Sequence, residues 1–189
     1  MEIQPKQVLE LIWIAWLISW VAASFWSGRT QKRAATVETW TYRAAMIAGG
    51  ALLVPWTGPL LEEKQIWEIG WPGAIVLTAI LVAGLLLTWW ARIYLGSLWS
   101  SVITRKEGHK IVDTGPYALV RHPIYTSHLL MGLGTPIASG LLLAFAGLLF
   151  FFIGFCIKLK QEESLLLSHF PDEYPAYKAR VKALVPFVF

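Results

Sequence analysis

The stretch HKIVDTGPYALVRHPIY, residues 109–125, determines how the rest of the sequence is interpreted. It is the densest polar and turn-forming segment in a chain that otherwise consists of apolar runs, and another such run begins at Pro123. A second polar cluster, residues 158–163, follows that run. We expect the two clusters to close over one bound molecule at a membrane surface.

The composition indicates an integral membrane protein. Hydrophobic residues make up 56% of the 189 residues and charged residues 15%, whereas soluble domains are roughly half apolar and roughly a quarter charged. Apolar blocks of about 18 or more residues predict spanning helices. The net charge of +4 comes from loops beside these blocks, which favours anionic lipid over nucleic acid as the partner. Cys156 is the only cysteine, which excludes an internal disulfide and a cysteine metal cluster.

The apolar runs predict an all-α fold with about five membrane spans. The fourth run is short enough to be re-entrant. A polar, amphipathic tail broken at Pro171 and Pro175 should follow the fifth. We interpret the chain as a single domain, residues 1–189, with the first three spans in residues 1–100. The expected spans cover residues 8–26, 44–61, 72–94, 123–138 and 141–157.

The charges of the loops predict the orientation in the membrane. The first and third loops are basic, the second is acidic and the fourth is uncharged. Cytoplasmic loops carry an excess of Lys and Arg, so we expect the amino terminus outside and the carboxyl terminus inside. Five spans satisfy this orientation, and both polar clusters then face the cytoplasm. The third loop contains Arg92, Arg105, Lys106, Lys110 and Arg121.

The first cluster has the pattern of a helix start beside a binding site. Pro123 favours a helix start, and the first N–H groups of that helix should point towards the loop and favour an anion. His122 and Tyr125 flank this place with hydrogen-bonding groups. The alternative is that Arg121 and His122 only anchor the chain at the surface.

The second cluster continues the fifth span if that helix extends. Glu162 then lies one turn beyond Lys158 on the same face, whereas Glu163 is rotated by about a quarter turn, so only one of the two acids should face a site. The alternative is a solvated helix end with a Lys–Glu pair. Together the two clusters suit a zwitterionic amino-acid tail attached to an aromatic base.

The motifs in both clusters resemble those of the isoprenylcysteine carboxyl methyltransferase family. Related phospholipid N-methyltransferases share the Arg-His-Pro and Glu-Glu elements. The likeness covers roughly the last 80 residues. It rests on the spacing of His109, Val112, Gly115, Tyr117, Arg121, His122, Pro123, Tyr125, Glu162, Glu163, Phe170, Tyr174, Tyr177 and Val181.

The resemblance implies a membrane methyltransferase that uses S-adenosylmethionine. The small five-span chain favours a prokaryotic cell membrane as its location. Its cofactor pocket would lie between the loop before the fourth span, the last two spans and the tail, within residues 101–189. Glu162 would meet the ammonium group of the cofactor. Lys158 stands where the family often has a substrate-binding Arg. The ammonium of Lys is a compact charge and lacks the planar guanidinium with which Arg binds both oxygens of a carboxylate. The implied cofactor contacts are His109, Lys110, Ile111, Val112, Tyr117, His122, Pro123, Ile124, Tyr125 and Glu162.

Methyl transfer from a sulfonium is an in-line displacement, so the main task of the protein is positioning. A carboxylate acceptor is already ionised and needs a cation to orient it, for which Arg121, Lys158 and Arg180 are candidates. An amine acceptor must lose a proton, which Glu163 could accept. We therefore expect Arg121, Lys158 and Glu163 to be the catalytic residues, and a lipophilic acceptor to enter sideways from the bilayer.

Two other functions fit parts of the sequence. NADPH-dependent membrane sterol reductases carry a similar Arg-His-Pro-x-Tyr element, but the Glu162-Glu163 pair favours a methyl donor. A small transporter or scaffold would need polar residues in mid-membrane, where the sequence offers mainly Ser19, Thr78 and Thr88. The four histidines lack metal-ligand spacing, so we expect no metal, and we interpret His128 as a packed helix residue.

Overall fold

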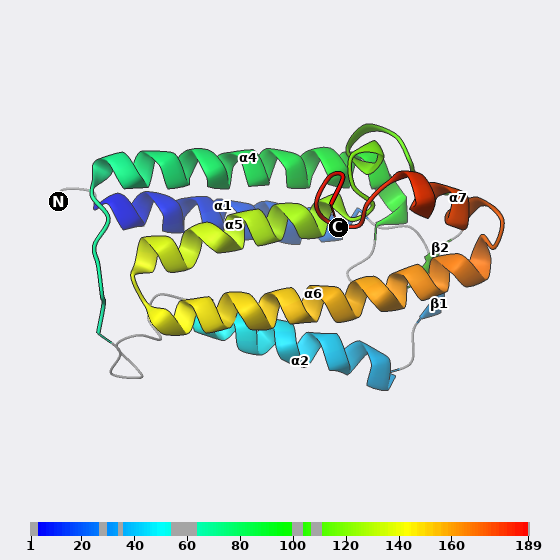
Figure 1. The fold of residues 1–189 in the computed structure, drawn as a ribbon, viewed down its shortest axis with the longest axis horizontal. Coiled ribbons are helices and arrows are strands. Elements are labelled where there is room, and N and C mark those ends of the chain that lie inside the picture. The colour runs from blue at the N-terminus through cyan, green and yellow to red at the C-terminus, as the bar shows by residue number, and fades with distance from the viewer. Residues whose placement is uncertain are drawn as a thin grey trace.

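A computed structural model describes residues 4–26, 30–33, 36–53, 64–99, 104–106 and 111–188. The regular elements among these described residues are helices and one short pair of strands, and the long helices run lengthwise through the molecule (Figure 1). The helices are α1 (Pro5–Ser24), α2 (Thr36–Leu53), α4 (Trp71–Leu95), α5 (Pro123–Ser139), α6 (Leu142–His169) and α7 (Glu173–Arg180), with short 3₁₀ turns η1 (Gly96–Leu98) and η2 (Gly115–Ala118).

Proline and glycine set the ends of the helices in the second half of the chain. Pro123 is the first residue of α5, where its missing N–H costs nothing. Gly140 ends α5 with a positive φ of 66°, and its N–H donates to the carbonyl of Pro136. A Cβ at Gly140 would lie 2.2 Å from the backbone oxygen of Trp67. This position therefore requires glycine, and the turn leads directly into α6.

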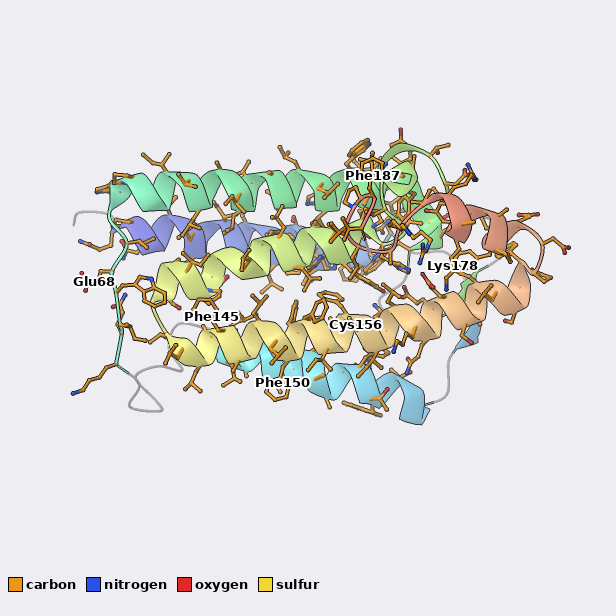
Figure 2. The ribbon with its side chains drawn as sticks, viewed as in Figure 1. Glu68, Phe145, Phe150, Cys156, Lys178 and Phe187 are labelled. Atoms are coloured by element: carbon orange, nitrogen blue, oxygen red, sulfur yellow. The ribbon has the colours of Figure 1, made fainter. Side chains whose placement is uncertain are left out.

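The helices form two groups that meet along α5 and α6. α1 and α5 pack on α4, and α2 packs on α6. Small residues allow α2 and α6 to approach closely, because a Cβ at Gly147 would lie 2.8 Å from the backbone oxygen of Gly49. Figure 2 shows apolar side chains such as Phe150 projecting from the outer surface of the bundle, as expected where lipid covers the protein.

The chain is an integral membrane protein. Three helical segments, Gln7–Ser24, Trp71–Leu98 and Leu142–His169, are long and apolar enough to cross a membrane. α5, the expected fourth span, has 17 residues and is the shortest of the expected spans that the structure describes in full. The number of five spans stays a prediction. The described part of α2 ends at Leu53, and the rest of the expected span of residues 44–61 lies outside the described residues.

The structure corrects several expected boundaries. α6 continues past the expected end of the fifth span at residue 157 to His169, so the second polar cluster lies on this helix, as its one-face interpretation requires. The helix stops before Pro171, whereas Pro175 lies inside the first turn of α7 and does not break it. The strands β1 (Thr30–Arg33) and β2 (Thr104–Lys106) pair antiparallel, which the hydrophobic pattern did not predict.

The sequence analysis places Arg92 in the third loop, and this prediction is wrong. Arg92 lies near the end of α4, where it is fully buried. Its guanidinium lies between the rings of Trp26 and Trp99, at 4.7 and 4.6 Å from their centroids. It also donates hydrogen bonds to backbone carbonyls at the ends of α1 and α4, namely those of Ala23, Trp26 and Gly96. Arg92 therefore fastens α1 to α4 rather than serving as a surface charge.

Candidate functional site

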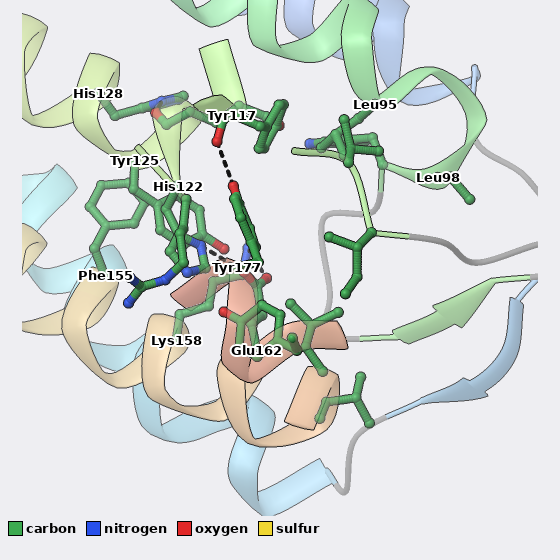
Figure 3. Close-up of a pocket in the computed structure, with 18 of the residues that line it drawn as sticks. Leu95, Leu98, Tyr117, His122, Tyr125, His128, Phe155, Lys158, Glu162 and Tyr177 are labelled. Carbon is green, nitrogen blue, oxygen red and sulfur yellow. Dashed lines mark hydrogen bonds and ion pairs between the residues drawn. The ribbon is translucent and has the colours of Figure 1, made fainter. Parts of the chain in front are cut away.

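A cavity of about 360 Å³ lies at the end of the bundle where α5 begins and α6 carries its polar cluster. The turn η2, the helix α7 and side chains from α1, α2 and α4 complete its wall. Figure 3 shows His122 and Tyr125 on one side of this space and Lys158 and Glu162 on another. Two segments more than thirty positions apart in the sequence thus face one cavity.

The cavity collects most of the residues predicted from the sequence. Pro123 and Glu163 are not among the lining residues, and His109 and Lys110 lie outside the described residues. Of the two neighbouring acids only Glu162 lines the cavity, as the helix geometry predicts. The predicted residues that line it are Ile111, Val112, Tyr117, Arg121, His122, Ile124, Tyr125, Lys158 and Glu162.

Glu162 lies between a lysine and a histidine at the cavity wall. Its carboxylate is 3.8 Å from Nζ of Lys158, one turn earlier on α6, and 3.7 Å from Nδ1 of His122. The ammonium of Lys158 also lies over the rings of Tyr42 and Tyr125, at 5.5 and 5.2 Å from their centroids. One acid and one base, both largely withdrawn from water, are therefore held at the same wall.

Arg121 and Glu163 form a buried ion pair beside the cavity. The guanidinium binds one carboxylate oxygen through Nε at 2.9 Å and Nη2 at 2.5 Å, and Lys178 of α7 binds the other oxygen at 2.6 Å. Arg121 also donates to the backbone carbonyls of Lys178 and Val181. The charge of Arg121 is thus engaged in joining α6, α7 and the tail.

Four backbone N–H groups around the start of α5 bind within the protein, so the expected anion site is wrong for these four groups. The N–H groups of Arg121 and His122 donate to the carbonyls of Lys182 and Ala183 in the tail, at 2.8 and 3.0 Å. Further N–H groups in the first turn, those of Tyr125 and Thr126, donate to the carbonyl of His122. Two carbonyl groups of the tail thus bind N–H groups beside the helix start, where the sequence pattern predicts an anion.

Buried tyrosines tie α7 to the wall of the cavity. The hydroxyl of Tyr177 donates to the carbonyl of Tyr117 at 2.6 Å (Figure 3). Burial raises the pKa of both tyrosines above the ordinary value of a phenol. Both hydroxyls therefore remain protonated at neutral pH, and the bond between α7 and η2 persists.

Aromatic rings form a continuous wall from the polar end of the cavity into the bundle. His122 stacks on Tyr125 with 5.3 Å between ring centroids, and Tyr125 stacks on Phe155 at 4.7 Å. The wall continues from Phe155 to His128 at 5.8 Å, from His128 to Trp20 at 5.7 Å and from Trp20 to Trp99 at 5.3 Å. We call these six residues the aromatic wall.

Several lining residues were missed because the sequence alone favoured other roles for them. Trp16 and Trp20 of α1 belong to neither polar cluster, yet both line the cavity, and so does His128, which the sequence analysis interprets as a packed helix residue. The available signal was spacing: Trp16 and Trp20, like Phe151 and Phe155, are four positions apart and share one helix face. Among the described residues, no group of three or more His, Cys, Asp or Glu side chains could hold a metal ion.

A model of the isoprenylcysteine carboxyl methyltransferase (ICMT) family matches residues 76–168, which run from α4 almost to the end of α6. The matched region contains both polar clusters and the two helices that hold them. It thus includes most of the residues on which the sequence resemblance rests.

Curated relatives carry two kinds of name. The protein-S-isoprenylcysteine O-methyltransferase B of Arabidopsis thaliana is 35% identical over 133 residues, covering 66% of this chain and 63% of the relative. The cobalt-zinc-cadmium resistance protein CzcN of Cupriavidus metallidurans is 33% identical over 130 residues, covering 67% of this chain and 56% of the relative. The chain spans less than two thirds of the length of both relatives.

The fold is similar to that of a solved eukaryotic intramembrane Ras methyltransferase, ICMT. The TM-score is 0.55 at 22% sequence identity, over 78% of this chain and 53% of the solved one. At this identity the similarity concerns the fold alone. The family model, the curated relatives and the shared fold together confirm the likeness of this chain to the isoprenylcysteine carboxyl methyltransferase family.

Proposed function

We propose that this chain is a membrane methyltransferase that transfers the methyl group of S-adenosylmethionine to the carboxylate of an isoprenylcysteine or a similar lipophilic acid. One observation carries the proposal: a single cavity joins an ionic cluster of Lys158, Glu162 and His122 to the aromatic wall. Such a cavity suits one polar and one lipophilic ligand bound side by side.

The ionic end of the cavity fits the polar part of S-adenosylmethionine. The carboxylate of Glu162 can bind an ammonium group, and the nearby rings of His122 and Tyr125 can pack against a sulfonium or an adenine ring. Ile111 and Val112 supply apolar surface at the same end. When bound, S-adenosylmethionine supplies an electrophilic methyl group on a positively charged sulfur.

Lys158 is the cation best placed to orient an acceptor carboxylate. Both Lys158 and Arg121 line the cavity, but the guanidinium of Arg121 binds Glu163 and carbonyls of the tail, whereas Nζ of Lys158 lies beside the cavity-lining carboxylate of Glu162. In the transfer, a carboxylate oxygen forms a bond to the methyl carbon while the sulfur–carbon bond breaks, and S-adenosylhomocysteine leaves. One positive and one negative charge disappear together, so surroundings that exclude water favour the transition state.

A carboxylate acceptor is supported over a phospholipid amine by the surroundings of Glu163. An amine must lose a proton during methylation, and Glu163 was the expected base. The carboxylate of Glu163 does not line the cavity and binds Arg121 and Lys178 instead. A carboxylate acceptor needs no base, so the described residues of the cavity suffice for its methylation.

The aromatic wall supports a lateral approach of the acceptor from the bilayer. It leads from the ionic cluster to Trp20, which lies on α1, one of the three helices that are apolar enough to span. We infer that the protein resides in a prokaryotic cell membrane, with its amino terminus outside and the cavity on the cytoplasmic side, because its basic loops flank that end.

Calorimetric titration of the detergent-solubilised protein tests the cofactor. We expect binding of S-adenosylhomocysteine and none of NADPH. Binding of NADPH alone would contradict the methyltransferase proposal and indicate a reductase. Binding of neither ligand would favour a transporter or scaffold.

Transfer of a radiolabelled methyl group tests the acceptor in the same preparation. We expect N-acetyl-S-farnesylcysteine to be methylated and phosphatidylethanolamine not. The reverse result would assign the chain to the phospholipid N-methyltransferases. Basic hydrolysis of the product adds a second criterion, because it releases methanol from an ester but not from a methylated amine.

A further inference from the structure

Tyr42 is a buried residue of α2 to which the proposed reaction gives no role. α2 lies outside residues 76–168, which the family model matches, and it carries none of the residues on which the sequence resemblance rests. Tyr42 is nevertheless only 2% exposed, and the centroid of its ring lies 5.5 Å from Nζ of Lys158 on α6. A helix without a recognised motif therefore contacts the cation that is proposed to orient the acceptor.

The packing of α2 on α6 brings Tyr42 to this position (Figure 1). Gly154 lies one turn before Lys158 on α6, and a Cβ there would lie 3.2 Å from the carbonyl oxygen of Tyr42. On the other side of Lys158 along α6, Gln161 donates to the hydroxyl of Thr41 at 3.1 Å. These two close approaches flank Lys158 and hold the first half of α2 against it.

The ring of Tyr42 is one of two aromatic rings that contact the ammonium of Lys158. The other belongs to Tyr125 of α5, whose centroid lies 5.2 Å from the same nitrogen. The two rings thus come from the two groups of helices that meet along α5 and α6. An aromatic face attracts a cation, and the attraction is stronger where water is excluded; Lys158 is only 8% exposed. The rings therefore restrict where the ammonium can lie.

The contact with Tyr42 differs from the other contacts of Lys158 in its relation to the cofactor. Glu162, 3.8 Å from Nζ, is proposed to bind the ammonium group of S-adenosylmethionine, so two like charges would then share one carboxylate. Tyr125 lines the cavity and is proposed to pack against the same cofactor, whereas Tyr42 does not line the cavity. Of these three contacts, only that with Tyr42 is not shared with the cofactor.

We propose that Tyr42 is a positioning residue whose ring face holds the ammonium of Lys158 and so aligns it with the carboxylate of the methyl acceptor. This inference rests on the proposed function and adds to it a residue that precedes the region matched by the family model. Tyr42 does not line the cavity, so it acts through Lys158. The ring performs this role, and the hydroxyl group does not.

Three substitutions of Tyr42 in the full-length protein test the role of the ring. Tyr42→Leu removes the ring, and we expect kcat/KM for N-acetyl-S-farnesylcysteine to fall about tenfold, mainly through KM, with the affinity for S-adenosylhomocysteine within about twofold. Tyr42→Phe keeps the ring face and should stay within about twofold of the wild type. Replacement by trifluorophenylalanine withdraws electron density from a ring of nearly the same shape, and should lower kcat/KM clearly below that of Tyr42→Phe.

Lys158→Met shows whether Tyr42 acts through Lys158. This substitution keeps an unbranched side chain but removes the charge, so the ring of Tyr42 has no cation to hold. In this background Tyr42→Leu should lower kcat/KM further by less than about twofold, because the effects of two coupled residues do not add. A loss of the same size in both backgrounds would show that Tyr42 only packs, and would overturn the proposal.

The matched control is Trp40→Leu on the same helix. Trp40 is 54% exposed, and its ring also contacts a cation, with 5.8 Å from its centroid to the guanidinium carbon of Arg43. It does not line the cavity. We expect this variant to keep the kcat/KM and the S-adenosylhomocysteine affinity of the wild type.

The outcomes separate this inference from the proposed function. Wild-type kcat/KM in Tyr42→Leu, with S-adenosylhomocysteine binding intact, would overturn the role of Tyr42 and leave the proposed function standing. Absence of methyl transfer by the wild type would overturn both. If Tyr42→Leu fails to bind S-adenosylhomocysteine because it does not fold, the comparison of phenylalanine with trifluorophenylalanine decides, and equal kcat/KM values for these two would overturn the role.

Discussion

Arg121 binds Glu163 across 42 positions of the sequence, through Nε at 2.9 Å and Nη2 at 2.5 Å, with both side chains 7% exposed. Because Lys178 binds the same carboxylate, this pair joins the start of α5, the middle of α6 and α7. Two of the three residues expected to perform catalysis, Arg121 and Glu163, thus join the elements that surround the cavity.

Substitution of Glu163 should lower the stability of the protein, because its carboxylate does not line the cavity but forms a buried ion pair. Glu163→Ala leaves the buried guanidinium of Arg121 without its partner, and breaking a buried pair in this way costs about 3–5 kcal/mol. Thermal unfolding in detergent should show a clearly lowered midpoint. The control is Glu68→Ala at an exposed site, with a change within about 0.5 kcal/mol; equal midpoints for both variants would contradict the structural role.

Substitution of Glu162 should act on the cofactor instead. Glu162→Ala removes the carboxylate that lines the cavity beside His122, and the loss of a hydrogen bond to a charged group weakens binding by about 10- to 100-fold. Titration with S-adenosylhomocysteine measures this. Lys160→Ala, on the exposed side of α6, should bind as the wild type does, and wild-type affinity in Glu162→Ala would remove this residue from the site.

Substitution of Lys158 should separate the acceptor from the cofactor. Lys158→Ala removes the cation proposed to orient the acceptor carboxylate, so we expect at least a tenfold fall in kcat/KM for N-acetyl-S-farnesylcysteine, with S-adenosylhomocysteine affinity changed far less. Lys158→Arg keeps the charge and should retain more activity than the alanine variant. A defect confined to cofactor affinity would assign Lys158 to the other ligand.

Tyr177 gives a prediction for pH. Tyr177→Phe removes the bond to the carbonyl of Tyr117 and should cost about 1 kcal/mol of unfolding free energy. Burial raises the pKa of Tyr177 above its unfolded value; its stabilising effect is therefore complete below the unfolded pKa and is lost only as the pH rises through the folded pKa. The difference between wild type and variant should be equal at pH 6, 7.5 and 9, and a difference that shrinks over this range would contradict it.

The sequence alone predicted the start of α5 and the faces of α6, because both depend on residues that are close together in the chain. Pro123 starts α5 as predicted, because a proline has no N–H to lose in the first turn. Lys158 and Glu162 share one face of α6, and Glu163 does not line the cavity, because helix geometry fixes residues four apart on the same side. The roles carried by the resemblance for His109 and Lys110 remain predictions.

Tertiary structure alone decided which distant groups meet. The backbone N–H groups of Arg121 and His122 bind the tail, the guanidinium of Arg121 binds Glu163, and Trp20 of α1 packs against His128 of α5. No local pattern encodes these contacts, since each depends on how separate helices pack and on which partner relieves the cost of a buried polar group. The sequence alone therefore determined the helices and the faces that carry the chemistry, and the packing determined which of those groups remain available to a ligand.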